Sequence, residues 1–163
     1  MLKKSKNPII VAGGGMGKSV KACKLLKEIA EKHNIPVVHS LMGIGSIPTD
    51  SKCSIGMIGM HGLPASNIAF AKADLIISLG CRFSDRVVAR CDLFKKDKKV
   101  IQVDIDSAEL SKSFKADLEI QSGIENFLKA FKNKTSDIPD FSQWLNVITK
   151  NKEKFKKDYT SDT

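Results

Sequence analysis

Short apolar runs alternate with helix-like segments along this 163-residue chain, and the alternation limits the folds that it can adopt. The runs at 9–12 (IIVA), 74–79 (DLIISL) and 99–104 (KVIQVD) predict strands, as do the segment 35–39 and, more weakly, 117–121. Because these runs have no polar face, they are typical of a parallel sheet with helices on both sides. We therefore predict a three-layer, doubly wound α/β domain.

Helices are expected between these strands. The segment 16–33 carries apolar residues at helical spacing, and the small residues of 65–73 follow Pro64, which suits a first helical turn. A short helix is expected at 107–111 and a further one at 124–131. In a doubly wound sheet, ligands bind outside the carboxyl ends of the strands, so the residues after each strand are the candidate site.

Two segments fall outside this pattern. The glycine-punctuated stretch 41–62 is too long for an ordinary connection, which indicates a functional loop. After Pro139, apolar residues at helical spacing across 141–148 predict an amphipathic helix, followed by a charged end. We expect a cofactor-binding domain over 1–138 and a helix with linker over 139–163.

The charge of the chain restricts the classes of partner. The formal net charge is +9, but the lysines are dispersed, and one Trp with one Tyr offers little for base stacking. This composition favours a solvated lysine surface over a nucleic-acid interface. No run reaches the roughly 20 apolar residues that a membrane span requires, and no signal-peptide cleavage pattern is present. We expect a cytoplasmic protein without a membrane partner.

The four cysteines predict neither a metal site nor disulfides. Cys23, Cys53, Cys81 and Cys91 form no CxxC pair. A domain of this size does not depend on disulfides for its stability, so free thiols are expected.

Arginine occurs only in one short window. Arg82, Arg86 and Arg90 fall just after a predicted strand, and every other strong cation in the chain is lysine. The planar guanidinium suits bidentate capture of phosphate or carboxylate, whereas the lysine ammonium is a hydrated point charge. The window predicts an anion-handling site, with a structural Arg–Asp85 pair as the alternative.

The glycines after the first strand admit three interpretations. The segment 12–19 (AGGGMGKS) matches a relaxed phosphate loop, in which Lys18 would contact phosphates and Ser19 a magnesium ion, as in a small NTPase or kinase. As a dinucleotide fingerprint it has Lys18 in the third glycine position, and the second strand ends without the expected acid. The third interpretation is that the backbone approaches a pyrophosphate closely at a helix N-terminus.

Single side chains add further candidates. His61 lies in the long loop and is a candidate ligand contact, while Met42, Met57 and Met60 are interpreted as core filler. Asp104 ends a strand and could accept hydrogen bonds from ribose hydroxyls, or it could cap the following short helix.

Taken together, these motifs resemble the central domain of acetolactate synthase (acetohydroxyacid synthase), a thiamine-diphosphate enzyme. The resemblance covers roughly residues 2–150 and is carried by IIVAGGG at 9–15, LMGIGSIP at 41–48, GMIGMHG at 56–62, ADLIISLGCRFSDR at 73–86 and VIQVDID at 100–106. It implies a Rossmann-like sheet of about six strands that holds FAD in an extended form, with the flavin largely structural. It also implies a role in carboligation, in which two 2-oxo acids are condensed with loss of CO2 in branched-chain amino acid biosynthesis.

The resemblance also implies a role for individual residues. It assigns the phosphate and sugar region to Gly13, Gly14 and Gly15; the flavin end to Leu41, Met60 and His61; the pyrophosphate and nearby groups to Arg82 and Arg86; and the adenosine to Asp104 and Ile105. Ser40, which stands where the family usually has Thr, and Gly80 are also expected to bind the cofactor. Arg82 would also form part of an active-site wall. No metal ligand is expected in this chain.

The pattern departs from the family at one point and omits its catalytic motifs. The family carries Gly-Asp before its last helix, where this chain has Ser122-Gly123, so the aspartate that would hold the adenine edge is missing. The resemblance implies that the catalytic glutamate and the motif for thiamine diphosphate and Mg²⁺ belong to other domains, so this chain alone would be inactive. It further implies a homo-oligomer, joined by a small regulatory subunit. A non-catalytic interaction module remains the third alternative.

Overall fold

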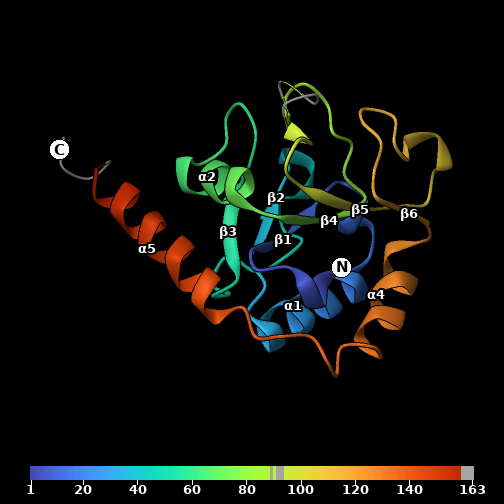
Figure 1. Cartoon of the computed structure of the whole chain (residues 1–163), viewed down its shortest axis with the longest axis horizontal. Coiled ribbons are helices and arrows are strands. Elements are labelled where there is room, and N and C mark those ends of the chain that lie inside the picture. The colour runs from blue at the N-terminus through green and yellow to red at the C-terminus, as the bar shows by residue number, and fades with distance from the viewer. Residues whose placement is uncertain (89, 91–93, 159–163) are drawn as a thin grey trace.

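The computed structural model describes residues 1–88, 90 and 94–158, and it contains one parallel sheet (Figure 1). The strand order is β3-β2-β1-β4-β5-β6, so β1 and β4 are neighbours at the point where the chain changes direction along the sheet. The strands are β1 (Pro8–Ala12), β2 (Val37–His39), β3 (Ser54–Met57), β4 (Leu75–Leu79), β5 (Lys99–Asp104) and β6 (Leu118–Gln121). The doubly wound α/β fold predicted from the sequence is confirmed.

Strand β3 lies inside the stretch that we predicted to be a loop. It has four residues and includes Gly56 at φ 127°, so it lacks the apolar run that identified the other strands. Its pairing with β2 shifts register between Val37 and Val38. Tertiary pairing with β2, rather than local propensity, therefore makes this segment a strand.

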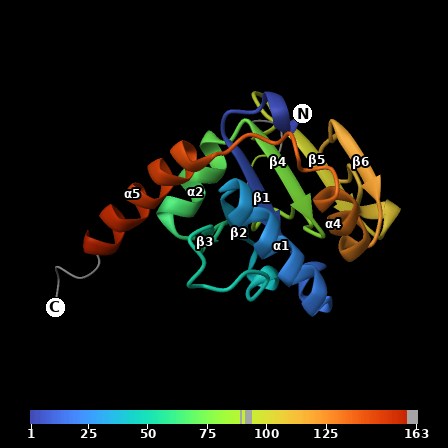
Figure 2. The same cartoon turned by 90° about the horizontal axis from the view of Figure 1, so that it is seen from below.

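Helices cover both faces of the sheet. On one face lie α1 (Val20–His33) and α4 (Ile124–Lys132), and on the other α2 (Pro64–Lys72) runs beside α5 (Ser142–Asp158), as Figure 2 shows. Four short 3-10 turns complete the described elements: η1 (Leu2–Lys4), η2 (Met16–Lys18), η3 (Leu41–Gly43) and η4 (Ser107–Glu109). In the described part of the chain, no helix has the length and apolar character that crossing a membrane would require.

The first long helix begins later than predicted. Residues 16–18 form the turn η2, and α1 starts at Val20, because the Ser19 hydroxyl accepts a hydrogen bond from the Ala22 amide at 3.1 Å and caps the helix. The helix ends at His33, and its C-cap residue Asn34 adopts the left-handed conformation at φ 56°.

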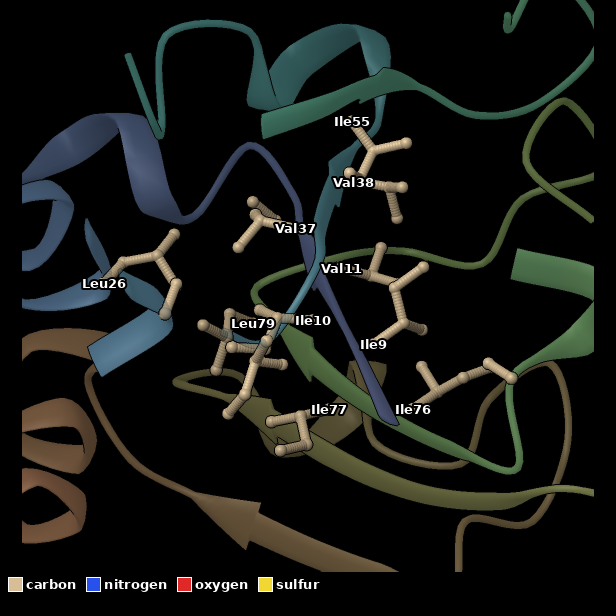
Figure 3. Close-up of a cluster of buried hydrophobic side chains, with 14 of the residues drawn as sticks. Ile9, Ile10, Val11, Leu26, Val37, Val38, Ile55, Ile76, Ile77 and Leu79 are labelled. Atoms are coloured by element: carbon tan, nitrogen blue, oxygen red, sulfur yellow. The ribbon is translucent and has the colours of Figure 1, made fainter. Parts of the chain in front are cut away.

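The core is formed by branched aliphatic side chains on both faces of the central strands. Ile9 and Ile10 project to opposite sides of β1 (Figure 3), and both are buried. Leu26 of α1 lies on the side of Ile10, while Ile76 of β4 lies on the side of Ile9. This two-sided burial explains why the strands have no polar alternation.

Helix α5 is fixed to the amino end of the sheet. Trp144 is buried, and its indole Nε1 donates to the Pro8 carbonyl at 3.0 Å. One turn earlier, the Phe141 amide donates to the His33 carbonyl at 2.9 Å, which joins the start of α5 to the end of α1.

Asp117 links the starts of the neighbouring strands β5 and β6. Its carboxylate accepts from Lys95 and, at 3.0 Å and 2.9 Å, from Lys99 Nζ and the Val100 amide. Partial burial acts to raise the pKa of Asp117, but the hydrogen bonds from Lys95, Val100 and Lys99 outweigh burial and lower the pKa to about 2.

We expect Asp117→Asn to lower the free energy of unfolding by about 1–2 kcal/mol at pH 7. The folded pKa lies below the ordinary value near 3.8, so this stability is present above pH 4 and is lost as the pH falls towards 2. Urea unfolding at pH 7, 4 and 2.5 measures the difference. Asp97→Asn, which changes an exposed carboxylate in the preceding turn, is the control, and equal losses from both variants would contradict the assignment.

Candidate functional site at the carboxyl edge of the sheet

The loops after β1 and β4 are joined by hydrogen bonds between their main chains. The Gly13 amide donates to the Leu79 carbonyl at 2.9 Å, and the Gly15 amide donates to the Gly80 carbonyl at 3.1 Å. The order in which strands are added to the sheet reverses between β1 and β4. This junction therefore lies at the point where doubly wound domains bind their ligands.

Glycine is required on both sides of this junction. A Cβ on Gly13 would lie 2.2 Å from the Gly80 carbonyl oxygen and 2.3 Å from the Cys81 Cα. Gly80 has φ 57°, and a Cβ there would lie 2.7 Å from the Gly15 Cα. The floor of the candidate site, formed by Gly13–Gly15 and Gly80, therefore consists of closely packed main chain without side chains.

The geometry argues against the phosphate-loop alternative. A phosphate loop needs the hydroxyl after its lysine to bind a metal ion. Here the Ser19 hydroxyl caps α1 and donates to Glu125 Oε2 of α4 at 2.8 Å. The segment before it is the turn η2 with a buried Met16, so it is a tight turn rather than an open anion loop.

The loop after β2 exposes apolar side chains beside the glycine floor. The Ser40 amide donates to the Ala12 carbonyl at 3.0 Å, which fixes the start of η3 next to β1. A Cβ on Gly14 would lie 3.1 Å from the Met42 Cβ, so the two loops are in contact. Leu41 is 65% exposed and Met42 is 76% exposed.

Two of the three methionines interpreted as core filler are on the surface. Met42 and Met60 are each about three-quarters exposed, because the turns that carry them project past the carboxyl edge of the sheet. Met57 ends β3 and is half-buried.

The loop after β3 is tied to the loop after β4. The Asn67 side chain of α2 accepts from the Gly59 amide at 2.9 Å and donates to the Gly59 carbonyl at 3.0 Å. The Met60 amide donates to the Arg86 carbonyl at 2.9 Å, and His61 is exposed beside it. Met60 and Arg86, 26 positions apart, are thus brought together.

Sequence reasoning missed Asn67. The available signal was an amide side chain inside a helix whose neighbours are small or apolar, because asparagine is a poor helix former unless its side chain has a specific partner.

The arginine pairing differs from the alternative that the sequence suggested. Arg82 Nε lies 3.4 Å from Glu109 Oε2, whereas the Asp85 carboxylate accepts from the Arg86 backbone amide at 2.9 Å. The Arg82 side chain is 74% exposed, and the Glu109 side chain is only 11% exposed. Glu109 lies in the turn η4 after β5. It was not identified from the sequence because residue spacing along the chain does not show which side chains of different crossover units come together.

The end of β5 completes the edge. Asp104 Oδ1 accepts from the Asp106 amide at 3.0 Å, and Asp106, not Asp104, caps η4 by accepting from the Ala108 amide at 2.9 Å. Ile105 is 71% exposed. The second carboxylate oxygen of Asp104 gives this edge an acceptor suited to sugar hydroxyls.

Cys81 lies below the edge and is not a nucleophile. Burial raises the pKa of its thiol to about 12, and the nearby Asp104 carboxylate adds to the rise, while hydrogen bonding with Ser40 acts in the opposite direction. The thiol is therefore protonated at neutral pH, and nucleophilic attack requires the thiolate.

No group of three or more His, Cys, Asp or Glu side chains in the described ranges 1–88, 90 and 94–158 could hold a metal ion.

Two hollows, of about 450 and 260 Å³, lie away from this edge. One lies between 5–7 and 139–147, and the other between 51–55 and 149–153. The candidate site is an open edge with a main-chain floor, an apolar rim and one arginine held by a carboxylate.

Comparison with known proteins shows the family to which the chain belongs. Residues 1–131 match the family described as thiamine pyrophosphate enzyme, central domain. The chain is 42% identical to the acetolactate synthase large subunit of Lactococcus lactis over 94% of its length, and 39% identical to a probable acetolactate synthase large subunit of Methanocaldococcus jannaschii over 91%. It is 32% identical over 95% of its length to acetolactate synthase 3, chloroplastic, of Brassica napus. The matches span only 26%, 25% and 24% of these relatives, so the chain corresponds to about a quarter of each.

Proposed function

Because the chain belongs to the central-domain family of thiamine pyrophosphate enzymes, we propose that it is the FAD-holding domain of an acetolactate synthase large subunit. The observation that carries the proposal is the glycine floor, where a Cβ on Gly13 would strike the main chain after β4. The Gly13 and Gly15 amides already donate to the Leu79 and Gly80 carbonyls, so the glycines support the proposal by letting the two strand ends meet as bare main chain, against which a pyrophosphate could lie.

The residues present fit an extended dinucleotide. Gly13, Gly14 and Gly15 would face its phosphate and sugar region, and Gly80 completes the floor. Arg82 and Arg86 would contact the pyrophosphate and nearby groups.

The two ends of the dinucleotide would lie on opposite sides of this floor. The exposed Leu41 and Met60 offer an apolar surface for the flavin ring, together with His61 and the Ser40 hydroxyl. On the other side, Asp104 and Ile105 would contact the adenosine.

In this proposal the domain binds and orients, and the chemistry belongs to other parts of the enzyme. When bound in those parts, thiamine diphosphate with Mg²⁺ would supply the chemistry for decarboxylating one pyruvate and joining it to a second 2-oxo acid. This chain contributes the flavin site and, through Arg82, a wall facing the active site. We assign residues 139–163 to the connection with a further domain, and we place the enzyme in the cytoplasm as a homo-oligomer with a regulatory subunit.

Flavin titration tests the proposal. We expect the purified chain to change FAD fluorescence saturably, because binding in an extended form separates the adenine from the flavin ring and moves the ring from water to the surface of Leu41 and Met60. Riboflavin lacks the pyrophosphate and adenosine and should bind at least about tenfold more weakly. An absence of any saturable fluorescence change with FAD, in protein with an intact circular dichroism spectrum, would refute the flavin-holding role.

Gly123→Asp is expected to increase the affinity for FAD about tenfold by supplying a carboxylate for the adenine edge. The backbone already suits a side chain, because Gly123 has φ −62° and its added Cβ would meet only Asn126 Nδ2 at 4.0 Å. Gly123 is also the N-cap of α4 and makes no side-chain cap, so aspartate should add about 0.5–1 kcal/mol of stability.

Two matched variants separate these effects. Gly123→Ala removes the glycine flexibility without adding a carboxylate, and Gly123→Asn adds a cap without the charge. If all three variants bind FAD alike, position 123 does not face the adenine.

A further inference from the structure

The side chain of Gln102 connects the loop after β5 to the site. Gln102 is in β5 and only 3% exposed. Its Nε2 donates to the Glu109 carbonyl at 2.9 Å, and its Oε1 accepts from the Ser111 amide at 2.9 Å. One buried amide therefore fixes both ends of the turn 109–111, and Ser111 is held there at the uncommon φ of 54°.

The same turn presents the carboxylate that meets Arg82. Glu109 Oε2 lies 3.4 Å from Arg82 Nε, and Glu109 Oε1 lies 3.1 Å from Lys112 Nζ. With its side chain only 11% exposed, the carboxylate is the fixed partner and the mostly exposed arginine the partner that it restrains.

The loop also fixes the backbone next to Arg82. The Ser113 hydroxyl donates to the Phe83 carbonyl at 2.7 Å, and the rings of Phe83 and Phe114 are 4.9 Å apart. The segment after β4 is therefore held by the loop after β5 through main chain, side chain and ring contacts.

We propose that Gln102 and Glu109 are positioning residues that preset the Arg82 guanidinium for the pyrophosphate of a dinucleotide. Glu109 engages Nε, which leaves the outer edge of the guanidinium, with its paired Nη donors, for two phosphate oxygens. The restraint lowers the side-chain entropy that binding would otherwise remove. The inference rests on the proposed flavin role for its ligand, but the restraint of Arg82 can be measured without one.

The first experiment uses the ligand-free chain. The protein has only three arginines, so a nitrogen-correlated NMR spectrum of the arginine Nε–H groups contains few signals, and Arg82→Lys identifies the one from Arg82. We expect Glu109→Gln and Gln102→Leu to shift this signal and to accelerate its hydrogen exchange about fivefold or more. Lys112→Gln, which removes the other cation on Glu109, should leave the exchange rate within about twofold. If Gln102→Leu leaves the Arg82 signal unchanged, the positioning role is wrong, whether or not FAD binds.

The second experiment is a double-mutant cycle with FAD affinity as the readout. We expect Arg82→Ala to weaken binding about tenfold and Gln102→Leu about fivefold, with no further loss when the two are combined. A merely structural Gln102 would give the same loss in both backgrounds, which would overturn the inference while leaving the flavin site standing. A wild-type chain that binds no FAD would refute the proposed function. The NMR experiment alone would then show whether Gln102 and Glu109 restrain the Arg82 side chain.

Discussion

Gly13→Ala is expected to lower the free energy of unfolding by about 3 kcal/mol and to abolish flavin binding. The added Cβ would lie 2.2 Å from the Gly80 carbonyl oxygen and 2.6 Å from the Cys81 nitrogen, and both are main-chain atoms. Relief would require β1 and β4 to separate at their carboxyl ends, which would break the Gly13 to Leu79 hydrogen bond. Urea unfolding followed by circular dichroism measures the loss.

Gly17→Ala is the matched control for this prediction. Gly17 belongs to the same glycine segment, but an added Cβ would meet nothing within 4 Å. We expect a change of less than about 1 kcal/mol, towards greater stability. Similar unfolding midpoints for the two variants would show that the close approach of the strand ends does not prevent a side chain at position 13.

Trp144→Ala is expected to cost about 3–4 kcal/mol and to release α5 from the sheet. The substitution removes a buried ring and the hydrogen bond from Nε1 to the Pro8 carbonyl. Loss of helical circular dichroism and faster proteolysis between 135 and 150 would report the release. Trp144→Phe keeps an aromatic ring and should cost about 1 kcal/mol.

Val147→Ala tests whether the Trp144 effect belongs to the helix in general. Val147 lies on the same helix and is half exposed, so we expect a loss below about 1 kcal/mol. Equal losses at 144 and 147 would contradict the specific role of the indole.

The sequence was sufficient to predict the layers of the fold because they depend on local patterns. Continuous apolar runs such as Leu75–Leu79 identify buried parallel strands wherever they occur. Strand β3 escaped prediction because it is short, contains Gly56 and depends on β2 for its pairing. The start of α1 was misplaced because nothing in the spacing of apolar residues distinguishes the turn η2 from a first helical turn.

The site was predictable in its outline and not in its pairings. Strand ends mark where a ligand would bind, so the sequence predicted that Gly13 and Arg82 would follow strands at one edge of the sheet. Glu109, the partner of Arg82, follows β5 and belongs to another crossover unit, so this proximity exists only after the sheet has formed. Asn67 lies only eight positions from Gly59, but its pairing depends on how the loop folds back on α2. Met42 was interpreted as core filler but is exposed, because the hydrophobicity of a residue does not show that its loop projects beyond the carboxyl edge of the sheet.

The glycine floor has a consequence for how this domain can change over evolutionary time. Where two main chains meet as closely as those at Gly13 and Gly80, no side chain can be introduced to alter the chemistry, so that part of the surface is closed to adaptation. Variation is confined to the surrounding rim, at positions such as Leu41, Met60 and Gly123, where added or altered atoms have space. New preferences for a ligand would therefore arise at the two sides of the glycine floor, while the floor itself stays the same.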